Sequence, residues 1–312
     1  MPQTILLVTR TPGLEDAVRD KLTDGAELTR VHSDEQTAEP IKDTEVIVGD
    51  PDLVAPHLHL AQRLKWFQST FAGVDAVFRR SSRRDYTLTR AAGLFGPSMA
   101  EYALAHILSR ERQLPTLAAS QIERRWNVVR YRRLADITIG LLGVGNIGLE
   151  VARVFKALGV TVWGLRNKRQ PVENVDRIYT SGQLAELLAG SDYVINLLPG
   201  TPQTRDLLSG DTLRTCKKGS VFINLGRGDV IDEESLVRAV EKKWLAGAIL
   251  DVFREEPLPS ESPLWQIPGV IITPHVAALG FATEIADIFI ANHERYRAGK
   301  PLLHQVDWKR GY

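Results

Sequence analysis

A glycine-rich turn lies between an apolar strand pattern and an apolar helix pattern, and it constrains the fold more than any other feature of the sequence. The strand Thr138–Leu142 leads into Gly143-Val144-Gly145-Asn146-Ile147-Gly148, after which apolar residues recur at helical spacing as far as Leu158. A second strand pattern follows at 160–164. A G-x-G-x-x-G run alone is weak evidence, but this strand–helix–strand context predicts a dinucleotide-binding unit.

The glycines of this turn have separate physical roles. Gly143 permits the tight turn, Gly145 allows a pyrophosphate to approach the backbone, and Gly148 allows the helix and strand to pack closely. The free N–H groups at the start of the helix favour phosphate oxygens. We therefore expect Gly143, Gly145, Asn146, Ile147 and Gly148 to contact the dinucleotide.

Strand and helix patterns alternate along most of the chain, which predicts an α/β protein with parallel sheets. The first part has apolar runs at 4–9, 45–48, 65–68 and 86–89, and a long helix opens at Pro97-Ser98. The second part has strand patterns at 137–142, 160–164, 193–198, 220–225, 246–252 and 270–273, with helices at about 147–158, 182–189, 203–215 and 232–243. The last helix pattern, 278–298, is expected to return to the first part.

These patterns predict two domains. We expect a substrate-binding domain from residues 1–98 and 283–312, and a dinucleotide-binding Rossmann domain at 99–282. Both are expected to be Rossmann-like, doubly wound parallel-sheet domains, with a cleft between them.

Composition excludes several other classes of protein. The 312 residues carry a net charge of +1, so no long-range field favours nucleic acid or a membrane as a partner. The single cysteine, Cys216, can form no internal disulfide, and the scattered histidines suggest no metal site. The opening segment is expected to be a strand and not a signal peptide, and no apolar run approaches the roughly 20 residues that span a bilayer. We expect a cytoplasmic protein.

The strand after the glycine loop ends in basic residues. An NAD site usually has an acidic residue about 20 positions past the loop, where it binds the ribose hydroxyls. Here Arg166-Asn167-Lys168-Arg169 stands at that point, without a carboxylate. A guanidinium can bind a phosphate but cannot accept a hydrogen bond from a hydroxyl. We therefore predict NADP(H) over NAD(H), bound by Arg166, Asn167 and Lys168; the alternative is a plain exposed basic turn.

Three charged residues follow three further strand patterns: Arg227 after 221–225, Glu256 after 248–253, and His275 after 270–273. The carboxyl ends of parallel strands border one crevice, where ligands bind. A cation, a carboxylate and an imidazole are therefore expected to converge there, where they can bind an acidic carbonyl compound and pass it a proton. Each residue taken alone is more typical of a structural or surface position.

The order and spacing of these motifs resemble the D-isomer-specific 2-hydroxyacid dehydrogenase family, and most closely its glyoxylate/hydroxypyruvate reductase branch. The similar segments cover almost the whole chain and include 64–75, 99–102, the glycine loop, 196–199, 224–228, 250–253 with 256–257, and 273–275. The resemblance implies that Arg227, Glu256 and His275 are the catalytic triad. It further implies reduction of a small 2-oxoacid to the D-2-hydroxyacid.

The chemistry of these side chains fits those roles. An imidazole titrates near neutrality, so His275 can protonate the carbonyl oxygen and remove the proton in reverse. Glu256 would bind the other ring nitrogen and favour the charged ring. Arg227 would bind the substrate carboxylate and polarise the carbonyl.

The resemblance extends to other positions. It makes the backbone amides of Ala72 and Gly73 donors to the substrate carboxylate, and it assigns further cofactor contacts to Pro199, Thr204, Leu225, Gly226, Asp251 and Ala277. The alternatives are a plain turn at Ala72-Gly73 and a strand-end cap at Asp251. It also implies a homodimer, with a helix over 97–120 as the contact.

Two other functions are alternatives to reduction of a 2-oxoacid. Some relatives of the family are dinucleotide-sensing corepressors, although all three catalytic positions are filled here. Formate dehydrogenases have an amide where Glu256 stands, which disfavours that activity.

Overall fold

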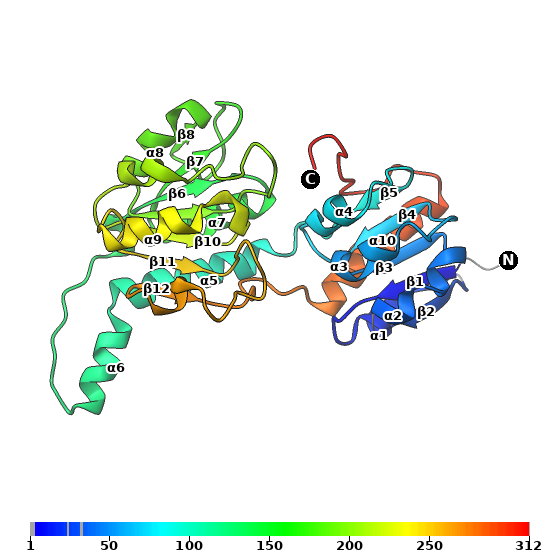
Figure 1. The fold of residues 1–312 in the computed structure, drawn as a ribbon, viewed down its shortest axis with the longest axis horizontal. Helices are drawn as coiled ribbons and strands as arrows, with labels where there is room; N and C mark the ends of the chain where they lie inside the picture. The colour runs from blue at the N-terminus through cyan, green and yellow to red at the C-terminus, as the bar shows by residue number, and fades with distance from the viewer. Residues whose placement is uncertain (1–3, 24, 32–33, 312) are drawn as a thin grey trace. The chain divides into compact units, whose positions relative to one another are not determined.

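The computed structural model describes residues 4–23, 25–31 and 34–311. The chain divides into two compact units, Met1–Phe95 with Gly280–Tyr312 and Gly96–Leu279 (Figure 1). Each unit has its own parallel β-sheet, as expected for two α/β domains. The domain boundaries expected after residues 98 and 282 each lie three residues beyond those observed, after Phe95 and Leu279. Which unit binds substrate and which binds the dinucleotide stays a prediction.

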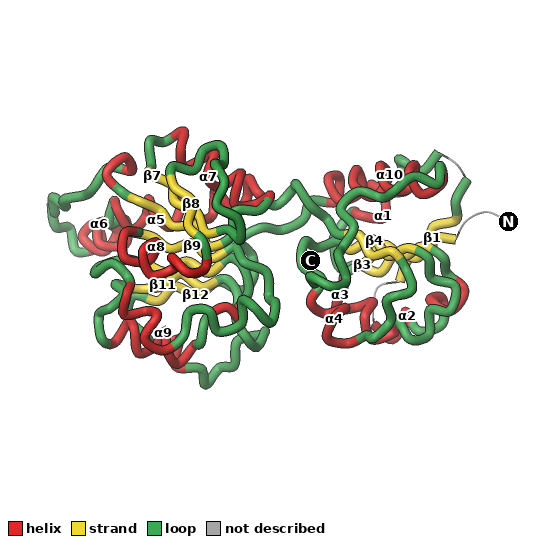
Figure 2. Tube along the Cα trace, turned by 90° about the horizontal axis from the view of Figure 1, so that it is seen from above, coloured by secondary structure: helices red, strands yellow, loops and turns green. Residues whose placement is uncertain are grey.

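The first unit has a five-stranded sheet in the order β2-β1-β3-β4-β5. Its strands are β1 (Thr4–Val8), β2 (Glu27–Val31), β3 (Val46–Gly49), β4 (Trp66–Ser69) and β5 (Thr87–Thr89), all paired in parallel. Its helices are α1 (Leu14–Arg19), α2 (Asp34–Thr37), α3 (Pro51–Val54), α4 (Asp75–Arg80) and α10 (Ala282–Arg297). Figure 2 shows α1 and α10 on one side of the strands and α3 and α4 on the other.

Burial on both faces of the sheet explains its apolar strands. Along β1, Ile5 and Leu7 pack toward α1 and α10, whereas Leu6 and Val8 pack toward α3. The C-terminal helix belongs to this unit because Phe289 and Tyr296 of α10 stack on the buried Trp66 ring.

The second unit has a seven-stranded sheet in the order β12-β11-β10-β9-β6-β7-β8. Its strands are β6 (Thr138–Leu142), β7 (Thr161–Leu165), β8 (Arg177–Tyr179), β9 (Tyr193–Asn196), β10 (Val221–Asn224), β11 (Gly247–Leu250) and β12 (Val270–Ile272). Its α-helices are α5 (Gly96–Glu111), α6 (Leu114–Ile122), α7 (Asn146–Ala157), α8 (Leu184–Gly190) and α9 (Glu233–Glu241). The strand order reverses between β6 and β9, and ligands bind at such a switch point in open α/β sheets.

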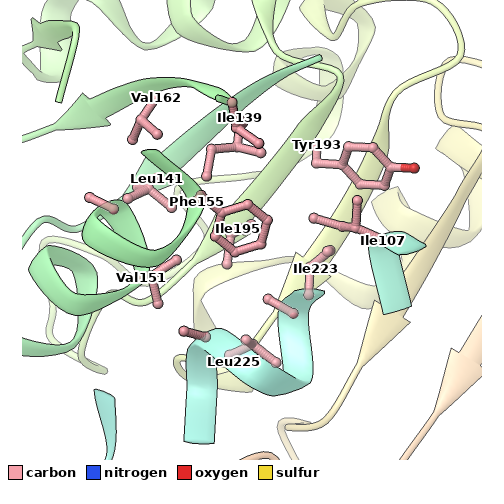
Figure 3. Close-up of a cluster of buried hydrophobic side chains, with 14 of the residues drawn as sticks. Ile107, Ile139, Leu141, Val151, Phe155, Val162, Tyr193, Ile195, Ile223 and Leu225 are labelled. Carbon is pink, nitrogen blue, oxygen red and sulfur yellow. The ribbon is translucent and has the colours of Figure 1, made fainter. Parts of the chain in front are cut away.

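Two apolar layers hold this second sheet between its helices. Ile139, Leu141, Ile195 and Ile223 pack with α5 and α7, as Figure 3 shows, together with Phe155 of α7. The alternate strand residues pack with α8 and α9 on the opposite face.

Several expected elements differ from the structure. The helix expected over 97–120 is two helices, since α5 ends at Glu111 and α6 begins at Leu114. Gln113 adopts a φ of 52° between them, and Pro115 cannot continue α5 because its ring would clash with the carbonyl four residues earlier. The helix expected over 203–215 is wrong, since only a 3-10 helix forms at Gly210–Thr215. Strands β2 and β8 were not expected, and both lie at sheet edges.

Candidate functional site

The three predicted catalytic residues all lie in the second unit, just beyond the carboxyl ends of neighbouring strands. Arg227 follows β10, Glu256 follows β11 and His275 follows β12, and these strands are adjacent in the order β12-β11-β10. Parallel pairing places all three loops at one edge of the sheet. The glycine loop follows β6 at the same edge, because β6 and β10 both pair in parallel with β9.

His275 and Glu256 form a direct pair. The Nδ1 atom of His275 lies 2.8 Å from Oε2 of Glu256. The other carboxylate oxygen, Oε1, accepts a hydrogen bond of 2.9 Å from the backbone N–H of Phe253. Both carboxylate oxygens are therefore fixed, and the ring orientation leaves Nε2 of His275 with no hydrogen-bond partner among the described residues. About half of the His275 side chain is exposed (52%), so a ligand can reach the ring.

The surroundings of Glu256 favour its charged form. Burial acts to raise the pKa of this carboxyl, but the hydrogen bonds from His275 and Phe253 and the positive charges of His275 and Arg227 outweigh it. The pKa of Glu256 is therefore lowered, and its charge is lost only when the pH falls through that lowered value. The carboxylate is thus ionised at neutral pH, where it can stabilise a protonated imidazole ring.

Arg227 lies in a loop held by two buried asparagines. Asn196 donates through Nδ2 to Oδ1 of Asn224 at 2.8 Å, and Asn224 donates through Nδ2 to the carbonyl of Arg227 at 3.2 Å. The guanidinium of Arg227 is half-buried and donates from Nη1 to the carbonyl of Gly226 at 2.7 Å. The role of these asparagines was not predicted from the sequence, although each is the last residue of its strand.

Gly226 and Gly228 allow this loop to pack closely against its neighbours. A Cβ atom at Gly226 would lie 2.6 Å from the carbonyl oxygen of Leu198, and one at Gly228 would overlap the backbone of Phe253. Any larger residue would displace the loops beyond β9 and β11. The two glycines therefore fix the position of Arg227 between them.

Asp251 binds the turn that contains His275. Its carboxylate is almost fully buried (1% exposed) and accepts hydrogen bonds from the Thr273 hydroxyl and from the N–H groups of Val276 and Ala277. The backbone carbonyl of Asp251 also accepts from the N–H of His275 at 2.9 Å. Asp251 thus has the strand-end capping role considered above, and its predicted contact with the cofactor stays a prediction.

His275 itself adopts an unusual backbone conformation. Its φ is 55°, in the left-handed region that costs roughly 1–2 kcal/mol for a residue with a side chain. The hydrogen bonds from 275–277 to Asp251 hold it there. Strain of this kind persists only where the surrounding structure determines it, and it is frequent at functional sites.

The glycine loop has the geometry expected of a phosphate-binding turn. Gly143 has a φ of 98°, and a Cβ atom at Gly148 would overlap the carbonyl of Gly143. By contrast, no described atom lies within 4 Å of the position of a Cβ at Gly145. Packing therefore requires Gly143 and Gly148, whereas Gly145 faces open space beside the first turn of α7. The residues present fit a dinucleotide pyrophosphate at this turn.

The end of β7 is basic in the structure as well. Arg166 is half-buried, and Asn167, Lys168 and Arg169 are exposed. Among the described residues no carboxylate forms an ion pair with Arg166, Lys168 or Arg169. These cationic groups remain available to a phosphate at the position where an acidic residue would bind a ribose hydroxyl.

The other predicted cofactor residues have structural contacts of their own. The Thr204 hydroxyl donates to the carbonyl of Pro199 at 2.6 Å and accepts from the N–H of Thr201 at 2.9 Å, which closes the loop after β9. The side chains of Leu225 and Ala277 are buried in the apolar layer beneath α5. Any contact of these residues with a cofactor stays a prediction.

Ala72 and Gly73 lie in the first unit, beyond the carboxyl end of β4. The loop is held by Ser69, whose hydroxyl donates to the carbonyl of Phe71 and accepts from the N–H of Phe71. The carbonyl of Phe71 also accepts from the N–H of Ala91 at 3.2 Å. Within the described chain the N–H groups of Ala72 and Gly73 have no hydrogen-bond partner, so they are available to an anion.

A cavity of about 610 Å³ lies elsewhere in the second unit. Its lining includes His106 and Arg110 of α5, Arg132, and Gly219 and Gly269 at the amino-terminal ends of β10 and β12. It is therefore at the sheet edge opposite the catalytic residues, and we assign it no part in the chemistry. Among the described residues there is no cluster of three or more potential metal ligands, and no helix is long and apolar enough to cross a membrane.

Comparison with known proteins shows the family. The family model for the D-isomer specific 2-hydroxyacid dehydrogenase NAD binding domain matches residues 104–277, within the second unit. The glyoxylate/hydroxypyruvate reductase A of Photorhabdus laumondii is 34% identical over 82% of this chain and 85% of its own length.

Solved structures of the same family have the same fold as this chain. A D-isomer specific 2-hydroxyacid dehydrogenase family protein from Aeromonas salmonicida has a TM-score of 0.93 and 35% identity, over 98% of this chain and 99% of that one. The NADPH-dependent glyoxylate/hydroxypyruvate reductase of Sinorhizobium meliloti, solved with NADP and sulfate, has a TM-score of 0.89 and 28% identity, over 99% and 100%. The chain therefore belongs to the D-isomer-specific 2-hydroxyacid dehydrogenase family, in its glyoxylate/hydroxypyruvate reductase-like branch.

Proposed function

We propose that this protein is an NADPH-dependent reductase that converts a small 2-oxoacid, such as glyoxylate or hydroxypyruvate, to the D-2-hydroxyacid. The observation that carries the proposal is the His275–Glu256 pair beside Arg227, at the same sheet edge as the glycine loop. An acid, its charged partner and a cation are the groups that reduction of an anionic carbonyl compound requires. The relatives from Photorhabdus laumondii and Sinorhizobium meliloti are named as reductases of such substrates, glyoxylate and hydroxypyruvate.

Two parts of the second unit would hold the cofactor. The turn 143–148 and the start of α7 would bind the pyrophosphate, and Arg166, Asn167 and Lys168 would bind the phosphate on the adenosine ribose. When bound, the nicotinamide supplies the hydride. Pro199, Thr204, Leu225, Gly226, Asp251 and Ala277 are proposed to line the rest of the site.

His275 is proposed as the general acid. Its Nδ1 is bound to Glu256, so Nε2 is the nitrogen that can donate a proton to the substrate carbonyl oxygen. The ionised Glu256 stabilises the imidazolium before the proton is transferred, and it fixes the ring orientation throughout. In the reverse direction the neutral ring accepts the proton from the hydroxyl group.

Arg227 is proposed to bind the substrate carboxylate and polarise the adjacent carbonyl group. A guanidinium presents paired donors that match a carboxylate, and its charge opposes the negative charge that develops on the carbonyl oxygen. The backbone amides of Ala72 and Gly73 are proposed as further donors to the same carboxylate. Their lack of partners in the first unit supports this role.

The decisive experiment is initial-rate reduction of glyoxylate, hydroxypyruvate, pyruvate and phenylpyruvate, each with NADPH and with NADH. We expect turnover with NADPH well above NADH and highest with the smaller acids.

The His275→Ala variant should bind NADPH as the parent does but lose about 10²–10⁴-fold in kcat, the range of general acid–base catalysis. Cofactor binding without turnover on any oxoacid would contradict the enzyme and favour a dinucleotide-sensing protein. Unchanged turnover in His275→Ala would contradict the mechanism alone.

We further propose that the protein is a homodimer formed through the second unit. Figure 1 shows α6 extending away from the sheet of its unit, followed by a loop that returns to β6. This arm, residues 113–131, carries apolar side chains that are almost fully exposed, including Ile122 (85%), Trp126 (96%) and Val128 (82%). Large apolar side chains exposed together on one short segment are typical of an interaction site, and a second copy of the chain is the proposed occupant.

A further inference from the structure

The turn that holds His275 is connected to α5 by a chain of two hydroxyl groups. Tyr102 lies in α5, and its hydroxyl oxygen is 2.6 Å from Oγ1 of Thr273. Thr273 in turn donates to Oδ1 of Asp251 at 2.6 Å. Since the single hydroxyl hydrogen of Thr273 points to the carboxylate, the Tyr102 hydroxyl must be the donor to Thr273. The direction of both hydrogen bonds, from Tyr102 to Thr273 and from Thr273 to Asp251, is thus fixed.

Asp251 transmits this connection to His275. Its Oδ1 accepts from both Thr273 and the N–H of Val276, and its Oδ2 accepts from the N–H of Ala277. Its backbone carbonyl accepts from the N–H of His275, whose φ of 55° is maintained only by its surroundings. A change in the orientation of the Asp251 carboxylate would therefore move the residues on both sides of the imidazole.

The Tyr102 ring is itself held in place by its packing. It is partly buried in the apolar layer beneath α5, and it packs against the His106 ring one helical turn later, with 4.5 Å between the ring centroids. Burial raises the pKa of the Tyr102 hydroxyl, and the negative charge of Asp251 acts in the same direction. The phenol is therefore protonated at neutral pH and can donate.

We infer that Tyr102 is a positioning residue for the proposed reaction: through Thr273 and Asp251 it holds the turn that directs Nε2 of His275 toward the substrate. The inference rests on the proposed function for its catalytic consequence and on the structure alone for its effect on the turn. Tyr102 contacts neither His275 nor, in our proposal, the substrate. Its contribution should therefore appear in the proton-transfer step and not in cofactor binding.

The test is the Tyr102→Phe variant, which removes one hydroxyl and keeps the ring. We expect kcat to fall about threefold to tenfold, since small displacements of a catalytic group slow the chemical step strongly. The dissociation constant of NADPH, measured by fluorescence, should stay within about twofold, because Tyr102 is not among the proposed cofactor contacts and the glycine loop and the end of β7 are unchanged. The kinetic isotope effect with NADPH deuterated at the transferred position should increase, which shows that the chemical step has become slower.

Tyr193→Phe is the matched control. Its hydroxyl is buried and donates to Oε1 of Glu111 at 2.7 Å, so its removal tests the general cost of losing a tyrosine hydrogen bond within the same unit. We expect a loss of thermal stability at least as large as that of Tyr102→Phe, because the lost bond is to a carboxylate, but an unchanged kcat and isotope effect. A double variant, Tyr102→Phe with Thr273→Val, should be no slower than Thr273→Val alone, because Tyr102 acts only through Thr273.

Amide hydrogen exchange separates this inference from the proposed function. Tyr102→Phe should accelerate exchange at the N–H groups of His275, Val276 and Ala277 about threefold or more, and Tyr193→Phe should not. If the parent reduces no oxoacid, the proposed function fails, and exchange alone decides whether Tyr102 holds the turn. If exchange in the 273–277 segment is unchanged, or if Tyr193→Phe slows kcat as much as Tyr102→Phe, the inference is overturned.

Discussion

At the scale of single residues, the basic end of β7 offers a direct test of cofactor choice. We expect Arg166→Ala with Lys168→Ala to lower kcat/KM for NADPH about tenfold to a hundredfold and to change kcat/KM for NADH less than threefold. The reason is that charge-assisted hydrogen bonds to a phosphate contribute about 1.5–3 kcal/mol, and NADH lacks that phosphate. Steady-state kinetics with both cofactors measure the effect.

Arg153→Ala provides the charge control for that experiment. Arg153 is exposed on α7 and pairs with Glu150, so its removal changes the net charge of the unit without touching the end of β7. If Arg153→Ala lowers kcat/KM for NADPH as much as the β7 variant does, the effect of the β7 variant comes from a general loss of positive charge. Equal losses with NADPH and NADH in the β7 variant would contradict phosphate recognition by Arg166 and Lys168.

The catalytic residues could be predicted from the sequence because each has a reactive or charged side chain and follows a recognisable strand pattern. Arg227, Glu256 and His275 each follow an apolar strand, and a parallel sheet brings the ends of such strands together. Asn196, Asn224 and Tyr102 lie in segments that carry the family resemblance, but no local pattern shows what their side chains do. Their hydrogen-bond partners are 28 and 171 positions away. Tyr102 and Thr273 are 171 positions apart, and no local pattern joins them.

At the scale of an element, the turn between β6 and α7 contains two glycines with different roles. Gly148 is required for packing, and Gly145 is proposed to leave space for the ligand. We expect Gly148→Ala to lower the free energy of unfolding by about 1–3 kcal/mol, since its Cβ would overlap the backbone of Gly143. We expect Gly145→Ala to fold with nearly the parent's stability but to bind NADPH at least about tenfold more weakly, because its Cβ would occupy the space of the pyrophosphate.

Urea unfolding and NADPH titration of both variants check this pair of predictions. The backbone of Gly145, with φ −93°, is accessible to alanine, so no strain obscures the result. A Gly145→Ala variant that binds NADPH normally would show that the pyrophosphate does not approach this residue. A stable Gly148→Ala variant would mean that the turn can relax around the additional methyl group.

Elements were predictable where the local pattern and the tertiary environment agree. Strands buried on both faces, such as β6 and β10, consist mostly of apolar residues and were expected. The edge strand β2 alternates exposed and partly buried residues in a short segment, and the three-residue edge strand β8 begins with the exposed Arg177. The expected helix at 203–215 failed because Thr204 bonds to neighbouring backbone groups and Leu208 pairs with Ile231.

At the scale of the whole molecule, each unit places its proposed ligand groups by the same rule. Both sheets are parallel, so every loop that follows a strand lies at one edge of its sheet. In the first unit that edge has the backbone amides of Ala72 and Gly73, for which the described residues provide no hydrogen-bond partner. In the second it has the glycine loop, the basic end of β7 and the His275–Glu256 pair. Loops at the opposite edges are thereby available for other roles, including assembly.

The α6 arm gives the prediction that concerns assembly. Trp126 is 96% exposed, so within one chain its side chain has few contacts to lose. We expect the parent to be a dimer by light scattering at micromolar concentration, and Trp126→Ser to raise the dimer dissociation constant at least about tenfold, as for a buried aromatic at an interface. The thermal stability of the dissociated variant should equal that of the dissociated parent.

Leu158→Ser serves as the control, because Leu158 is a partly exposed apolar residue (43%) at the end of α7, outside the arm. It should leave the dissociation constant unchanged if the arm is the interface. A parent that is monomeric at tens of micromolar would contradict the dimer, and a Trp126→Ser variant that associates as tightly as the parent would place the interface elsewhere. Since the arm connects α5 to β6, and α5 holds Tyr102, dissociation that also slowed turnover would indicate that assembly contributes to the position of the catalytic turn.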